Sequence, residues 1–160
     1  MTTDDERARP GRVVITGATG LVGRPLLRAL RADGHAVTAL VRDAARARAA
    51  VGAGVELVEV ADLETPGPWL DTLAGAAAIV HLAGEPIAGQ RWDARHKQLI
   101  RDSRVEPTRV MVEHLATLAP AERPRALVSA SGIDYYGAAD PLLDDDDPVT
   151  ERAPAGDSFL

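Results

Sequence analysis

Three glycines near the N-terminus have the spacing of a phosphate-binding loop. They follow the pattern G-x-x-G-x-x-G, directly after a β-branched run at residues 12–16 and at the start of a helical pattern at residues 21–32. Gly17 permits a tight turn off the strand, Gly20 lets the backbone approach a pyrophosphate, and Gly23 lets the helix pack closely on the sheet. The free N–H groups and the positive dipole of the helix N-terminus would bind the phosphates. The sequence therefore predicts a dinucleotide site, with a purely structural glycine turn as the alternative. The predicted contacts are Gly17, Thr19, Gly20, Leu21, Val22 and Gly23.

The residues that follow the second predicted strand bear on which dinucleotide would bind. About twenty residues after the glycine loop, an acid suits the ribose 2′-hydroxyl of NAD, whereas a cation suits the 2′-phosphate of NADP. Arg42 comes first here, and its guanidinium can hold a phosphate with two hydrogen bonds. Asp43 is the competing acid, unless it points to solvent or begins the next helix. Arg24 offers a second positive contact or is a solvated helix residue. The sequence favours NADP, with NAD as the alternative.

A strand pattern followed by a helix pattern recurs along the chain, which is typical of a parallel sheet with crossover helices. Strands are predicted at residues 12–16, 36–41, 55–60, 77–82 and 125–129, and helices at 21–32, 43–51, 68–74 and 94–118, the last bent near Pro107. Right-handed connections then give an α/β fold, a Rossmann-like doubly wound parallel sheet with helices on both faces. On helix 21–32 one face is predicted to hold Leu21, Val22, Pro25, Leu26, Ala29 and Leu30.

Composition limits the organisation and the partners of the chain. Its 160 residues suit one domain, predicted at 12–160 after a disordered leader at 1–11. A net charge of −6 argues against nucleic acid and anionic membranes as partners, and no run approaches the ~18 apolar residues of a membrane span. The absence of cysteine excludes disulfides and cysteine metal sites and fits a cytoplasmic protein. The acidic run 144–147 lacks the spacing of a calcium loop, so no metal is expected.

Three later segments carry a family resemblance. Asp62 and Leu63 resemble the acid-containing turn that contacts adenine in short-chain dehydrogenases/reductases. The run His81, Leu82, Ala83, Gly84 resembles their Asn-Ala-Gly segment, which lines the cofactor. Residues 129–137 (SASGIDYYG) resemble the serine-rich strand end and Tyr-Gly turn of the extended branch. The resemblance implies cofactor contacts at Asp62, Leu63, Leu82, Ala83 and Gly84, whereas His81 is predicted to be a packed or capped histidine.

A closer resemblance comes from residues 84–92 (GEPIAGQRW), 101–104 (RDSR), 107–109 (PTR) and 151–160 (ERAPAGDSFL). These runs resemble the YfcH-like group of the NAD-dependent epimerase/dehydratase family, and the likeness extends over residues 12–160. Each has a plainer alternative: Glu85 can cap its loop, Trp92 can be a partly buried core residue, and Ser103 and Arg104 can pack or pair within their helix.

The resemblance implies a tyrosine, with a lysine four residues later, that moves a proton while hydride moves to or from nicotinamide. Tyr135 and Tyr136 belong to the turn motif, and the single lysine of this sequence is Lys97, so the pair is missing. A serine that orients the substrate carbonyl is also implied. Ser131 is the candidate, with Gly132 as the competing position.

The expected protein is therefore an NADP(H)-binding epimerase/oxidoreductase-like chain acting on a sugar-like or other carbonyl substrate. We expect it to be truncated before the C-terminal substrate region, which would leave apolar sheet surface for a partner or a homo-oligomer to cover. The alternatives are a non-catalytic dinucleotide-binding, redox-sensing module and an inactive fragment of such an enzyme.

Overall fold

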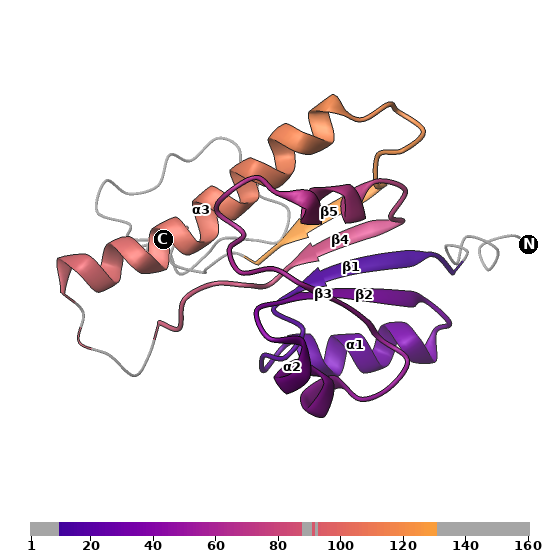
Figure 1. Ribbon diagram of the computed structural model, residues 1–160, viewed down its shortest axis with the longest axis horizontal. Helices are drawn as coiled ribbons and strands as arrows, with labels where there is room; N and C mark the ends of the chain where they lie inside the picture. The colour runs from indigo at the N-terminus through magenta and orange to yellow at the C-terminus, as the bar shows by residue number, and fades with distance from the viewer. Residues whose placement is uncertain (1–9, 88–90, 92, 131–160) are drawn as a thin grey trace, which may run out of the picture.

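The computed structural model describes residues 10–87, 91 and 93–130, which form one five-stranded parallel sheet (Figure 1). The strand order is β3-β2-β1-β4-β5. This order and the all-parallel pairing confirm the predicted doubly wound sheet. The strands are β1 (Arg12–Thr16), β2 (Ala36–Val41), β3 (Glu56–Glu59), β4 (Ala78–His81) and β5 (Ala126–Ser129).

Helices cover both faces of the sheet, as predicted (Figure 1). The helices α1 (Gly23–Ala32) and α2 (Ala44–Val51) pack on one face, whereas α3 (Ala94–Thr117) and the 3₁₀ helix η1 (Pro68–Leu73) pack on the other. Successive residues of β1 serve the two cores in turn, because side chains alternate along a strand. Val13 and Ile15 pack against Leu27 of α1, whereas Val14 packs in the core that holds Met111 of α3.

The order in which strands are added to the sheet changes side at β1. The chain first adds β2 and β3 on one side of β1, and then adds β4 and β5 on the other side. Thr16, the last residue of β1, is paired in register with Leu40 of β2 and with His81 of β4. The ends of β1 and β4 therefore form the switch point at which doubly wound sheets bind ligands.

The face predicted for the first helix is correct at Leu26 and Leu30 and wrong at its other positions. Helix α1 begins at Gly23, so Leu21 and Val22 belong to the preceding loop and are 86% and 61% exposed. Pro25 and Ala29 are exposed too. The side that packs on the sheet consists of Gly23, Leu26, Leu27 and Leu30. This set has the i, i+3, i+4, i+7 spacing, counted from Gly23 rather than from Leu21.

Other predicted bounds hold to within two residues, and Pro107 lies buried inside α3. The predicted leader falls almost wholly on residues 1–9, outside the described residues, as do Trp92 and everything after Ala130. Among the helices that the structure describes, none is long and apolar enough to cross a membrane. No group of three or more potential metal-binding side chains occurs in this same part of the chain.

Candidate dinucleotide-binding site

The glycine loop is packed against the neighbouring backbone so closely that two of its glycines admit no side chain. Gly17 has φ +69°, and a Cβ placed there would lie 2.7 Å from the carbonyl carbon of Leu82. A Cβ on Gly23 would strike the carbonyl oxygen of Gly17 and would lie 2.8 Å from Cα of Ala18. Gly17 thus makes the predicted tight turn. At Gly23 the atoms nearest to an added Cβ belong to Gly17 and Ala18, where the loop leaves β1.

The loop leaves the N-terminus of α1 open to solvent. The N-cap residue is Val22, whose side chain cannot accept a hydrogen bond, and residues 19–22 are all exposed. In the described part of the chain, no acceptor binds the N–H groups of Leu21 and Val22. Uncapped N–H groups at a helix N-terminus are suited to bind a phosphate.

Thr16 ties β1 to the segment that follows β4. Its Oγ1 accepts hydrogen bonds from the N–H groups of Leu82 (3.2 Å) and Ala83 (3.1 Å), and it lies 2.7 Å from Nδ1 of His81. Because two donors already occupy the hydroxyl oxygen, its proton points to Nδ1, and the neutral imidazole carries its own proton on Nε2.

His81 is a packed histidine, as the sequence favoured, with only 2% of its surface exposed. Burial lowers the pKa of its imidazole, and the positive charge of Arg104 lowers it further. Its Nε2 is buried and has no hydrogen-bond partner among the described residues.

The segment after β4 is also held from the side of α3. The hydroxyl of Ser103 accepts from the N–H of Glu85 at 2.9 Å, and Nη2 of Arg104 donates to the carbonyl of Glu85 at 3.2 Å. Ser103 and Arg104 therefore contact the segment that holds Leu82, Ala83 and Gly84, the residues that family resemblance assigns to the cofactor. The helical pattern alone gave no sign of this contact, because it depends on how α3 crosses the sheet.

Arg42 and Asp43 have separate environments at the end of β2. The Asp43 carboxylate caps α2 and accepts from the N–H of Arg46 at 2.8 Å, so this acid begins the next helix, one of the alternatives foreseen. Arg42 is exposed and has no hydrogen bond or ion pair within the described residues. Glu59 also lies beside this position and was not predicted as a site residue. Its carboxylate accepts from the N–H of Ala44 at 2.9 Å. Its position at the end of β3, beside β2, was the available signal.

Asp62 closes a local turn after β3. One carboxylate oxygen accepts from the Thr65 hydroxyl at 2.6 Å and the other from the N–H of Glu64 at 2.7 Å. These two bonds, the Thr65 one foremost, lower the pKa of the Asp62 carboxyl. Leu63 is partly buried against the core beneath η1 and α3. The contacts of Asp62 and Leu63 with adenine stay predictions.

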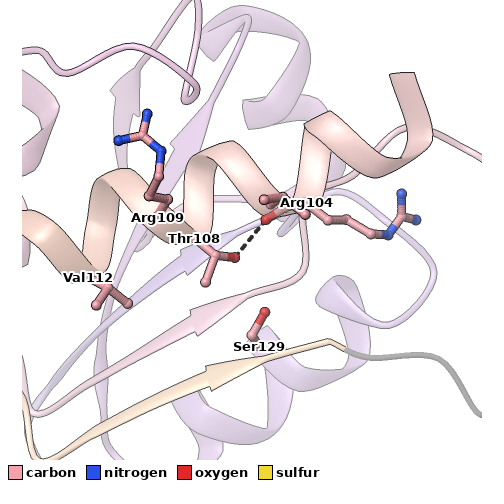
Figure 2. Close-up of a pocket in the computed structure, with 6 residues that line it drawn as sticks. Arg104, Thr108, Arg109, Val112 and Ser129 are labelled. Carbon is pink, nitrogen blue, oxygen red and sulfur yellow. Dashed lines mark hydrogen bonds between the residues drawn. The ribbon is translucent and has the colours of Figure 1, made fainter. Parts of the chain in front are cut away.

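A separate groove of about 460 Å³ runs between α3 and β5. Its lining is Arg104, Val105, Thr108, Arg109, Val112 and Ser129. Figure 2 shows Thr108 and Ser129 on opposite sides of the groove, with the Arg104 side chain directed away from Ser129. The predicted Ser131 lies outside the described residues.

Comparisons with known proteins agree with this architecture. A profile of the NAD dependent epimerase/dehydratase family matches residues 13–157. The epimerase family protein SDR39U1 homolog of Arabidopsis thaliana is 37% identical, over 92% of this chain and 40% of its own length.

Two solved structures are also similar. Human epimerase family protein SDR39U1 with NADPH is 31% identical with a TM-score of 0.60, covering 78% of this chain and 38% of its own. A short-chain dehydrogenase/reductase superfamily protein of Agrobacterium tumefaciens with bound NAD is 27% identical with a TM-score of 0.61, covering 89% and 40%. The chain thus spans less than half the length of each of these three proteins. On this evidence it belongs to the NAD-dependent epimerase/dehydratase family, as its sequence motifs predicted.

Proposed function

We propose that this chain binds NADP(H) across the ends of β1 and β4, as the nucleotide-binding part of an epimerase- or reductase-type enzyme. The observation that carries the proposal is the uncapped N-terminus of α1, which a turn without room for side chains at Gly17 and Gly23 places beside β4. The pyrophosphate would accept from the N–H groups of this helix end. Relatives with bound NADPH and bound NAD support a nicotinamide dinucleotide as the ligand.

The choice of NADP over NAD follows from the end of β2. The acid that would recognise a ribose 2′-hydroxyl, Asp43, is engaged as the cap of α2, whereas the guanidinium of Arg42 is exposed and without a partner among the described residues. Glu59 occupies the N–H of Ala44, which a 2′-phosphate could otherwise have used. Arg42 is therefore the principal ligand proposed for the 2′-phosphate, with Arg24 as a second positive contact.

The substrate proposed is a sugar-like or other carbonyl compound, on which the whole enzyme would act by hydride transfer. A second candidate is a non-catalytic module that binds the dinucleotide and senses redox state. Hydride exchange between labelled NADPH and a panel of carbonyl compounds would distinguish the two candidates.

The cofactor is tested by titrating the purified chain with NADPH and NADH, followed by fluorescence and by thermal melting. A ligand at ~100 times its dissociation constant should add ~2.7 kcal/mol to the free energy of unfolding. Arg42→Ala should weaken NADPH at least about tenfold, since a charge-assisted phosphate contact contributes about 1.5–3 kcal/mol, and it should leave NADH unchanged.

Arg28→Ala is the matched control, because Arg28 is an exposed arginine of α1 away from the loop. An equal loss of NADPH and NADH affinity in Arg42→Ala would contradict NADP selection at this residue. Failure of the wild-type chain to bind either nucleotide would end the proposal.

A further inference from the structure

Two adjacent side chains of α3 form hydrogen bonds with the backbone of Glu85, the residue after Gly84. Ser103 Oγ accepts from the N–H of Glu85 at 2.9 Å and donates to the carbonyl of Ile100 at 3.0 Å. Arg104 donates through Nη2 to the carbonyl of Glu85 at 3.2 Å and through Nη1 to the carbonyl of Ile100 at 2.9 Å. Both backbone polar groups of Glu85 are thus tied to one turn of α3.

The absence of a side chain at Gly84 lets the guanidinium of Arg104 lie close to the backbone of the segment. A Cβ at Gly84 would lie 2.9 Å from Cζ of Arg104 and 3.1 Å from both of its terminal nitrogens. The guanidinium is half-buried and has no carboxylate within ion-pair distance among the described residues. Its planar fork serves two carbonyls at once, which the single ammonium of a lysine does less well.

The opposite end of the same segment is fixed by β1. Thr16 binds the N–H groups of Leu82 and Ala83, and the Gly17 backbone lies against both residues. Residues 82–85 are therefore anchored by β1 on one side and by α3 on the other.

The position of the segment decides which part of a dinucleotide it would meet. If Arg42 holds the adenosine 2′-phosphate beyond β2, and the end of α1 holds the pyrophosphate beside β1, then the other half of the molecule must extend over β4, which follows β1 in the sheet. Residues 82–85 come directly after β4 and would therefore lie beneath the nicotinamide half of the dinucleotide.

We propose that Ser103 and Arg104 are positioning residues that hold residues 84–85 in the conformation that receives the nicotinamide half of the cofactor. This inference rests on the proposed function. It assigns to α3 a part of the affinity for NADP(H) that neither the glycine loop nor Arg42 supplies.

The test compares two ligands of the full chain by isothermal titration calorimetry: NADPH, and adenosine 2′,5′-bisphosphate, which lacks the nicotinamide half. Arg104→Lys keeps the charge but not the fork, and we expect it to weaken NADPH about tenfold. Ser103→Ala removes the neutral hydrogen bond to the N–H of Glu85, together with the local bond to Ile100, and should weaken NADPH about threefold. Neither variant should change the affinity for the bisphosphate. Arg101→Ala, which removes a charge from an exposed position of the same helix, should change neither ligand.

Four results would overturn the inference. A variant that loses both ligands equally would show a general loss of structure, and wild-type NADPH affinity in Arg104→Lys would show that only the charge matters. Variants that bind both ligands like the wild type would remove the positioning role while leaving the proposed function intact. If the wild-type chain binds neither ligand, the proposed function and this inference fail together.

Discussion

Replacing Thr16 by valine should destabilise the chain by about 3 kcal/mol, although valine has nearly the shape of threonine and favours strands. The change removes the hydroxyl that binds the Ala83 N–H and Nδ1 of His81, and it leaves the Leu82 N–H with only its 3.3 Å bond to the Thr16 carbonyl. Leu82 and Ala83 are half-buried, and because the Leu82 N–H keeps one acceptor, the losses at the two N–H groups should together cost about 1 kcal/mol. Nδ1 belongs to a side chain that is 2% exposed, so it stays unpaired at a cost of about 1–3 kcal/mol.

The measurement is urea unfolding at pH 7.5, supported by thermal melting. At this chain length 1 kcal/mol corresponds to about 2–4 °C, so Tm should fall by about 6–12 °C. Thr38→Val is the matched control, because Thr38 is also a fully buried strand threonine but its hydroxyl donates to the exposed carboxylate of Glu56. That carboxylate returns to water when the hydroxyl is lost, so the cost should stay below about 1 kcal/mol.

Equal losses in the two variants would refute the argument, because burial of the threonine alone would then account for both. A loss below about 1 kcal/mol in Thr16→Val would show that the hydroxyl does not satisfy this group of buried polar atoms. Thr16→Ser should restore most of the stability, since it keeps the oxygen and loses only a methyl group.

Two further predictions concern the same region. Gly23→Ala should lower the free energy of unfolding by about 1–3 kcal/mol in urea, despite the helix propensity of alanine, because its Cβ would meet the Gly17 and Ala18 backbone. Gly20→Ala, whose nearest atom is at 3.2 Å, should cost less, and a gain in Tm for Gly23→Ala would contradict the packing. The pKa of His81 is lower in the folded chain than the ordinary value of 6.5. Below pH 6.5 the unfolded chain therefore binds a proton at this residue more readily than the folded chain does. The free energy of unfolding should fall as the pH drops below 6.5. The slope from this one group is at most about 1.4 kcal/mol per pH unit, and wild-type and His81→Gln chains with the same pH dependence would contradict it.

Local patterns predicted the sheet well, because the central strands β1, β2 and β4 are largely buried and each appears as a short apolar run. The run at residues 36–41, for example, is β2 to the residue. The face of α1 was predicted only in part, because Leu21 and Val22 are apolar and directly precede the helix. A helical period counted from these two residues selects exposed positions such as Pro25 and Ala29. Their exposure follows from the glycine loop, which projects past the end of the sheet.

The candidate site was predictable only in part, for a different reason. The glycine spacing and the order of Arg42 and Asp43 are local in sequence, and the structure gives Asp43 one of the two roles foreseen for it. The bonds from Thr16 to residues 82 and 83 span more than sixty positions and exist only because β1 and β4 are in a particular register. Likewise Glu59 reaches Ala44 only because β3 pairs with β2. No periodicity in a single sequence carries such register information.

Long-range contacts give α3 a second structural role besides packing on one face of the sheet, because its side chains also hold the segment after β4. The side chain of Arg104 lines the groove beside β5, while its guanidinium binds the carbonyl of Glu85 at the end of the β4 segment. Any group that packs into the groove would therefore touch the same side chain that holds the backbone of Glu85. If Arg104 has the positioning role proposed above, a group bound in the groove should therefore change the affinity for NADPH.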